Sequence, residues 1–266
     1  MTEGFDPEFV HQFEYETWTR CAPDYLDGFS GLTRETLPML IEAAEIEKGF
    51  HVLDVGSGPG HICGTLVDMG CSATGIDFSG AMVEIAREEY PGASFYEGNA
   101  EEMPFDDVAF DSSISNFVVH HLARPEEVFS EVARVLKNKG RLACAVFADP
   151  ESQSSPGAFF AAVEEHYSVD ELPHGPLFGV TDLDIHRKML EAGGFSDTSF
   201  EFKPVSWRSE AAETVFSSFA VWANLQALPE DVRDKIREST LKNYEAFKTN
   251  DGYEFPHEAL IASASK

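Results

Sequence analysis

The sequence has few cysteines and no long hydrophobic run. Its four cysteines, Cys21, Cys63, Cys71 and Cys144, show no C-x-x-C spacing, which argues against a zinc site or a redox pair and favours reduced thiols. No apolar run approaches the roughly 18 residues of a membrane span. The amino terminus carries acids rather than the basic residues of a signal peptide. We therefore expect a cytoplasmic protein with no membrane span and no metal site.

Basic residues are also scarce. The 266 residues include 19 Lys and Arg against 47 Asp and Glu, which gives a net charge of −28. Such a surface repels a phosphate backbone, so a nucleic-acid substrate is disfavoured and a small molecule is favoured. A basic acceptor nitrogen, attracted by the acidic surface, is a further possibility. The composition leaves the oligomeric state open.

The sequence does contain a glycine-rich turn after an apolar run. Residues 52–60 read V-L-D-V-G-S-G-P-G, and a second acid, Asp77, closes the next apolar run. Glycines lack a Cβ, so the turn can adopt positive φ and lie against a ligand, and the helix that follows presents unpaired N–H groups. Asp77 is placed to accept hydrogen bonds from a ribose diol. Because His61 stands where the third glycine of G-x-G-x-x-G would fall, the pattern predicts a nucleoside-binding βαβ unit of another kind.

The pattern D-x-G-x-G-x-G after a strand resembles motif I of the class I S-adenosylmethionine (SAM)-dependent methyltransferases. Further segments match this family in order: residues 98–105 (G-N-A-E-E-M-P-F) are similar to its G-D-A-x-x-L-P-F, residues 110–122 resemble motif IV, and residues 134–141 resemble R-V-L-K-P-G-G. The resemblance, which extends to the type-11 or ubiquinone-biosynthesis methyltransferases, covers residues 34–148 well and residues from 193 onward more loosely. It implies SAM as the cofactor.

The resemblance also implies roles for single residues. Asp54 would organise the loop and the methionine ammonium group, Asp77 would bind the ribose, and Asn99, where the family more often has Asp, would accept from the adenine amino group. Phe78 and Met82 would pack against the adenine, with plain core packing as an equal alternative. The expected cofactor-binding residues are Tyr25, Asp54, Gly56, Ser57, Gly58, Gly60, Asp77, Phe78, Met82, Asn99, Ala100, Glu101, Asn116 and Phe117.

Two histidines follow the expected fourth strand. A neutral imidazole is a suitable base at pH 7, so His120 and His121 are the candidate catalytic residues. The sequence H-H-L recurs in relatives of different chemistry, which makes a structural role the alternative. Tyr25 and Trp18 resemble aromatic positions that close over the cofactor in related enzymes.

Strand and helix patterns alternate along the chain. We expect strands at 50–55, 71–77, 93–97, 109–117, 140–147, 196–205 and 257–262, and helices at 60–69, 79–90, 125–137 and 181–191, with a further helix capped by Thr33 and reaching about residue 47. This alternation predicts an α/β fold with a doubly wound, mostly parallel seven-stranded sheet of the Rossmann-like methyltransferase type. We expect residues 34–148, 181–205 and 252–266 to form the core. Residues 1–33, 149–180 and 206–251 would form a helical cap.

The sequence thus predicts a SAM-dependent methyltransferase that methylates an O, N or C nucleophile of a small molecule. A quinone- or sterol-type C-methyltransferase is one alternative. A SAM-binding regulator without catalytic activity is the alternative from a different class.

Overall fold

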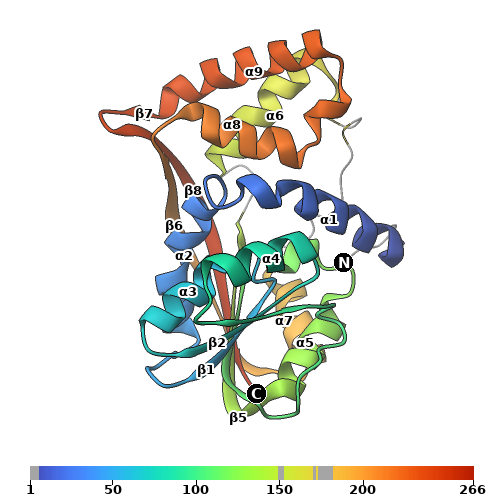
Figure 1. Cartoon of the computed structure of the whole chain (residues 1–266), viewed down its shortest axis with the longest axis vertical. Coiled ribbons are helices and arrows are strands. Elements are labelled where there is room, and N and C mark those ends of the chain that lie inside the picture. The colour runs from blue at the N-terminus through green and yellow to red at the C-terminus, as the bar shows by residue number, and fades with distance from the viewer. Residues whose placement is uncertain (1–5, 149–152, 170–171, 173–181) are drawn as a thin grey trace.

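A computed structural model describes residues 6–148, 153–169, 172 and 182–266 (Figure 1). Within them, eight strands form one sheet of order β3-β2-β1-β4-β5-β8-β6, and the short β7 pairs with β8 outside this path. Strands β1 to β5 are parallel to their neighbours, whereas β8 runs antiparallel to β5 and β6. The predicted doubly wound, mostly parallel sheet is therefore confirmed, with β7 as an additional short strand. The strands are β1 His51–Val55, β2 Ser72–Asp77, β3 Ser94–Glu97, β4 Phe110–Asn116, β5 Leu136–Phe147, β6 Ser196–Ser209, β7 Lys248–Thr249 and β8 Gly252–Ser265.

Helices cover both faces of the sheet. The helices against it are α2 Ser30–Ala43, α3 His61–Asp68, α4 Gly80–Glu89, α5 Pro125–Val135 and α7 Leu183–Ala192. Side chains of β5 alternate between two hydrophobic cores: Ala143 and Ala145 join the core under α2 and α3, whereas Leu142 and Cys144 join the core under α5 and α7. This alternation is the period of two that a strand buried on both faces requires.

The start of α2 differs from the prediction. Thr33 does not cap this helix, because α2 begins at Ser30 with Phe29 in the N-cap position. The Thr33 N–H donates to the Phe29 carbonyl at 3.1 Å and is already inside the first turn. The Thr33 hydroxyl instead contacts His61 Nε2 at 2.8 Å. A capping side chain must precede the helical ladder, so the prediction of Thr33 as the cap is wrong.

The last two strands are longer than expected. β6 continues to Ser209 rather than ending at 205, and β8 begins at Gly252 rather than near 257. The two strands pair antiparallel from Ser199 opposite Ser263 to Ser209 opposite Tyr253. The polar composition of these segments did not predict strands, but cross-strand pairing stabilises them. The end of β6 therefore lies within the segment 206–251 that was expected to be an insertion.

Three further helices lie beyond the carboxyl ends of the parallel strands. α6 Ser154–His166, α8 Ala212–Trp222 and α9 Glu230–Tyr244 pack together in what we call the three-helix cluster (Figure 1). Phe159 and Phe219 stack with ring centroids 5.4 Å apart, and the Tyr244 hydroxyl donates to the Ser155 carbonyl at 3.2 Å. Short 3-10 turns occur at η1 Ala22–Asp24, η2 Val119–His121, η5 Leu225–Ala227 and η6 Glu245–Phe247. Residues 149–152, 170–171 and 173–181, which include much of the predicted insertion 149–180, lie outside the described residues.

Helix α1, Pro7–Cys21, crosses between the three-helix cluster and the sheet (Figure 1). Arg20 donates to the carbonyls of Val221 at 2.9 Å and Trp222 at 3.2 Å, at the end of α8 where helical carbonyls lack partners. On the opposite side, the Thr19 and Ser79 hydroxyls lie 3.1 Å apart. Helix α1 is thus bound to both parts of the molecule by side chains.

None of the helices described is both long and apolar enough to cross a lipid bilayer.

Candidate functional site

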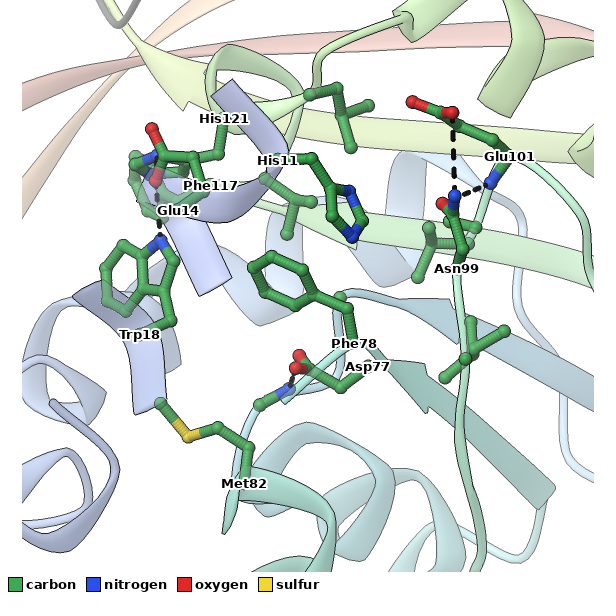
Figure 2. A pocket seen from close by; sticks show the side chains of 18 of the residues that line it. His11, Glu14, Trp18, Asp77, Phe78, Met82, Asn99, Glu101, Phe117 and His121 are labelled. Carbon is green, nitrogen blue, oxygen red and sulfur yellow. Dashed lines mark hydrogen bonds and ion pairs between the residues drawn. The ribbon is translucent and has the colours of Figure 1, made fainter. Parts of the chain in front are cut away.

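A cavity opens at the carboxyl ends of β1, β2 and β4, with α1 across its mouth. Figure 2 shows side chains of α1, the β2–α4 turn, the loop after β3 and the turn after β4 converging on it. We call this space the first cavity. In a doubly wound sheet, ligands bind at this edge. The lining residues are His11, Glu14, Trp18, Tyr25, Val55, Gly56, Gly58, Ile76, Asp77, Phe78, Met82, Gly98, Asn99, Ala100, Glu101, Asn116, Phe117, Val118, His121, Leu122 and Ala123.

The three glycines of the loop after β1 have different environments. All three have positive φ, at +72° for Gly56, +51° for Gly58 and +84° for Gly60. A Cβ on Gly58 would meet no atom within 4 Å, whereas a Cβ on Gly60 would lie 2.7 Å from Phe95 and 2.8 Å from Ala86. Gly58 therefore borders open space beside the first cavity. Gly60 allows close packing of the loop against β3 and α4 and does not line the first cavity.

We expect Gly60→Ala to destabilise the protein by about 2–4 kcal/mol, because backbone strain adds to a steric clash. Gly58→Ala carries the positive-φ strain without the clash, so we expect a loss of only about 1 kcal/mol. Urea denaturation of both variants measures the difference. Equal losses would contradict the packing role of Gly60.

Asp77 closes β2 and points at the glycine-rich loop (Figure 2). Its Oδ2 accepts the Gly58 N–H at 2.8 Å and its Oδ1 accepts the Ser79 N–H at 2.9 Å. Burial raises the pKa of Asp77 to about 6, although these two hydrogen bonds oppose the shift. Each carboxylate oxygen keeps a free lone pair. Asp77 therefore offers two adjacent acceptors, which match the two hydroxyls of a ribose.

Asp54 and Ser57 lie behind the wall of the first cavity rather than on it. Asp54 is buried, and Cys63 Sγ donates to its Oδ2 at 3.6 Å. Burial raises the pKa of Asp54 to about 7, with the nearby Asp77 charge adding to the shift. The Ser57 hydroxyl is buried without a partner and lies where a side chain at Gly75 would stand. These two residues and Gly60 are the predicted cofactor residues that the structure does not place in the cavity lining.

The loop after β3 forms the opposite side of the first cavity. Asn99 Oδ1 accepts the Glu101 N–H at 2.9 Å, which leaves one lone pair of the amide oxygen free. Glu101 is held by Arg124 at 2.7 Å, and Arg124 also reaches Glu8 of α1 at 3.1 Å. Phe78 lies in the middle of the cavity, edge-on to His11 with ring centroids 5.7 Å apart (Figure 2). Ala100 and Met82 complete the apolar lining.

Asn116 and Phe117 close β4. The Asn116 amide donates to the Thr33 carbonyl at 2.8 Å and accepts from the Thr36 hydroxyl at 2.8 Å. Both ends of this amide are thus used to hold α2 against β4. Phe117 has φ of +57° and packs on Phe147 with ring centroids 4.6 Å apart. This backbone conformation places its ring between the first cavity and a second one.

The second cavity lies between the sheet and the three-helix cluster. It has a volume of about 230 Å³, compared with about 100 Å³ for the first cavity. Four residues line both cavities and form what we call the shared wall: Trp18, Tyr25, Phe117 and His121. His120 lines the second cavity but not the first. The other lining residues of the second cavity are Phe29, Leu32, Thr33, Val146, Phe147, Ala148, Gln153, Pro156, Gly157, Phe160, Phe219 and Trp222.

His121 of the shared wall contacts a carboxylate that the sequence did not single out. Its Nδ1 lies 2.9 Å from Glu14 Oε2, at hydrogen-bonding distance but without hydrogen-bond alignment. Trp18 Nε1 donates to the same oxygen at 3.1 Å, while the buried Glu14 Oε1 has no hydrogen-bond partner in the described part of the chain. Figure 2 shows these three side chains together at one end of the first cavity. Glu14 and Trp18 are one helical turn apart, a spacing that could have indicated a common face.

His120 has a different environment from its neighbour. Burial, followed by the charges of His121 and His186, lowers the pKa of His120 well below its ordinary value. Its ring packs against His121 at 4.3 Å and Phe147 at 5.8 Å between centroids. His120 is therefore neutral at pH 7.

In the part of the chain that the structure describes, no three His, Cys, Asp or Glu side chains lie together in a way that could bind a metal ion.

Comparisons with known proteins agree with the fold and the motifs. Residues 53–144 match the family model described as a methyltransferase domain. A demethylmenaquinone methyltransferase of Paenarthrobacter aurescens is 32% identical over 120 residues, which span 45% of this chain and 47% of that protein. The chain thus matches about half the length of this relative, and the resemblance to the methyltransferases is confirmed at the level of the domain.

Solved structures share the fold over most of the chain. The YcgJ protein of Bacillus subtilis superimposes with a TM-score of 0.58 at 21% identity, covering 88% of this chain and 98% of that one. A methyltransferase from an antibiotic biosynthesis pathway of Anabaena variabilis gives a TM-score of 0.62 at 17% identity, covering 86% and 96%. At these identities, the likeness establishes the Rossmann-like fold alone.

Proposed function

We propose that the chain, whose residues 53–144 match a methyltransferase domain, is a SAM-dependent methyltransferase that acts on an apolar small molecule. The observation that carries this proposal is the pair of cavities with one shared wall. The first cavity has the features of a nucleoside site, and the second is a largely apolar space next to it. Because the two cavities share four lining residues, ligands bound in them would lie next to each other, as transfer of a group between them requires.

The residues of the first cavity fit SAM. Asp77 would hold the ribose hydroxyls with the two lone pairs left by Gly58 and Ser79. Asn99 would accept from the adenine amino group, and Phe78 and Met82 would enclose the ring. When bound, SAM supplies a methyl group on a positively charged sulfur, which is strongly electrophilic. The protein's part is then to position the acceptor and to exclude water.

Residues 1–33, 149–180 and 206–251 would serve as the cap over this site. In the described part of these segments, α1 and the three-helix cluster supply Trp18, Phe160, Phe219 and Trp222 to the second cavity. The aromatic lining suits an acceptor with a ring. A quinone-type acceptor is one such molecule, and the relative from Paenarthrobacter aurescens is named for a demethylated quinone.

Gly157 of α6 offers a test of the second cavity. A Cβ at this position would meet no atom of the described residues within 4 Å, and Gly157 lines the second cavity but not the first. We expect Gly157→Leu to lower methyl transfer from radiolabelled SAM to a panel of phenols and quinols at least about tenfold, because the new side chain fills the acceptor space. SAM affinity by calorimetry should be unchanged, since Gly157 does not line the first cavity. Undiminished methyl transfer by Gly157→Leu would contradict the proposed acceptor site. If the wild type binds SAM but transfers no methyl group to any acceptor, the proposal is also contradicted, and a SAM-binding regulator is favoured.

A further inference from the structure

We infer that the acceptor is an uncharged, apolar molecule with a hydroxyl group, and that His121, positioned by Glu14, takes the proton of that hydroxyl. The inference rests on the proposed function, because it concerns the ligand of the second cavity. It adds the charge and functional group of the acceptor, and it assigns a role to Glu14.

The described lining of the second cavity offers no counter-charge to a charged acceptor. Among the described residues, no Asp, Glu, Lys or Arg lines it. An ammonium or carboxylate group would lose its hydration there without gaining a counter-charge, which is costly. The buried carboxylate of Glu14 lines only the first cavity, behind the ring of His121. An uncharged molecule is therefore the ligand that this space accommodates.

Most polar groups on this lining are already engaged by the protein. The Thr33 hydroxyl contacts His61 at 2.8 Å. The Gln153 amide donates to the Glu258 carbonyl at 2.9 Å, and its oxygen lies 2.9 Å from His257 Nδ1. The Tyr25 hydroxyl interacts with Thr33, so His120 and His121 remain as partners for a polar group of the ligand. A single hydroxyl next to the shared wall satisfies this arrangement.

His121 is the better proton acceptor of the two histidines. Its side chain is 10% exposed and that of Glu14 is 2% exposed, so their contact is shielded from water. Glu14 Oε2, which already accepts from Trp18, lies 2.9 Å from His121 Nδ1. A carboxylate in this position fixes the Nδ1–H tautomer and stabilises the imidazolium cation. Among the described residues, His120 contacts aromatic rings and no carboxylate.

The proton transfer then involves one bond broken and one formed. The acceptor O–H bond breaks, its electron pair stays on the oxygen, and the proton bonds to His121 Nε2, which makes no hydrogen bond within the described residues. A neutral pair becomes an oxyanion next to an imidazolium cation. Glu14 balances the cation from the other side of the ring. His121 is thus the catalytic residue and Glu14 the positioning residue.

The first test reads the tautomer directly and needs no acceptor. In nitrogen-15 spectra of histidine-labelled protein at pH 7, we expect His121 to carry its proton on Nδ1 and to leave Nε2 bare. Glu14→Gln, which keeps the shape but removes the charge, should move the ring towards the other tautomer and thereby assign the signal. Glu16→Gln, an exposed change on the same helix, should leave the spectrum unaltered. A proton on Nε2 in the wild type, or an unchanged spectrum in Glu14→Gln, would overturn the role of Glu14.

The second test uses three naphthalene probes of similar shape. In calorimetry we expect 2-naphthol to bind at least about tenfold more tightly than 2-naphthoate or 2-naphthylmethylammonium, because only the latter two are charged. Gly157→Leu should abolish the binding of 2-naphthol. Tighter binding of either charged probe, or no binding of 2-naphthol, would overturn the inferred acceptor class. A SAM titration of the same preparation tests the proposed function separately, since its failure would remove the cofactor and leave the tautomer result intact.

Discussion

Replacing Asp77 by alanine should weaken SAM binding by about 100-fold in isothermal titration calorimetry. The estimate corresponds to about 3 kcal/mol, the loss of two hydrogen bonds between hydroxyls and a carboxylate. The substitution also frees the N–H groups of Gly58 and Ser79, which the carboxylate now holds at 2.8 and 2.9 Å. The loop after β1 would then lose its attachment to the end of β2. Both the lost hydrogen bonds to SAM and the released loop should weaken SAM binding.

A matched control lies on the same βαβ unit. Asp68 is exposed at the last turn of α3, at the opposite end of this helix from the glycine-rich turn. Asp68→Ala should leave the dissociation constant for SAM within a factor of about two, as expected for an exposed surface charge. If Asp77→Ala binds SAM as tightly as Asp68→Ala does, SAM is not the ligand of the first cavity.

Asp54→Asn should stabilise the ligand-free protein at pH 8 and have little effect below about pH 4, where the side chain is largely protonated in both states. Burial raises the pKa of Asp54 from 3.8 to about 7. Between these values the unfolded chain has released this proton and the folded chain has not, so the folded state loses stability as the pH rises from about 4 to about 7. Full ionisation costs about 4 kcal/mol at 1.36 kcal/mol per pH unit. Asparagine avoids this cost, so we expect a gain of about 2–4 kcal/mol at pH 8 in urea denaturation.

Asp111 provides the comparison with the opposite sign. Burial acts to raise its pKa, but hydrogen bonds from the His51 N–H at 2.8 Å and from Lys137 at 2.7 Å hold the pKa below its ordinary value. Its contribution to stability is present at neutral pH and is lost on acidification. Asp111→Asn should therefore destabilise the protein at pH 8. A loss of stability in Asp54→Asn at pH 8 would contradict a buried, costly carboxylate at that position.

The sequence was a good guide to the part of the site that local chain geometry builds. The glycine-rich turn, the acid at the end of β2 and the Asn99 segment each follow a strand, and parallel strands bring their carboxyl ends to one edge. The family resemblance therefore located Gly58, Asp77, Phe78 and Asn99, all of which line the first cavity.

Three of the predicted cofactor residues, Asp54, Ser57 and Gly60, lie outside the cavity lining for a physical reason. Side chains alternate across a strand, so Val55 reaches the first cavity while Asp54 points towards Cys63 of α3. Proximity in sequence to the turn could not reveal this difference. Whether Asp54 still affects SAM binding through the loop stays a prediction.

The contacts made by α1 were beyond sequence analysis for another reason. Glu14 meets His121 more than a hundred residues away, and the meeting depends on how α1 is held by α8 and α4. Periodicity predicts which face of a helix is buried but not what lies opposite. The full length of β6 and β8 could not be predicted for the same reason, because each strand is stabilised by hydrogen bonds to a partner that is distant in the sequence.

The long pairing of β6 with β8 also determines which part of the enclosure is rigid. These strands run from the sheet to the three-helix cluster without interruption, hydrogen-bonded to each other along the way (Figure 1). Such a two-stranded connection resists bending, so we expect the three-helix cluster to keep a fixed position relative to the sheet. Within the described residues, no strand adjoins helix α1 in the sequence, and the helix is held by side-chain contacts such as those of Arg20 and Glu8. We therefore expect α1, rather than the three-helix cluster, to be the part that moves when ligands enter.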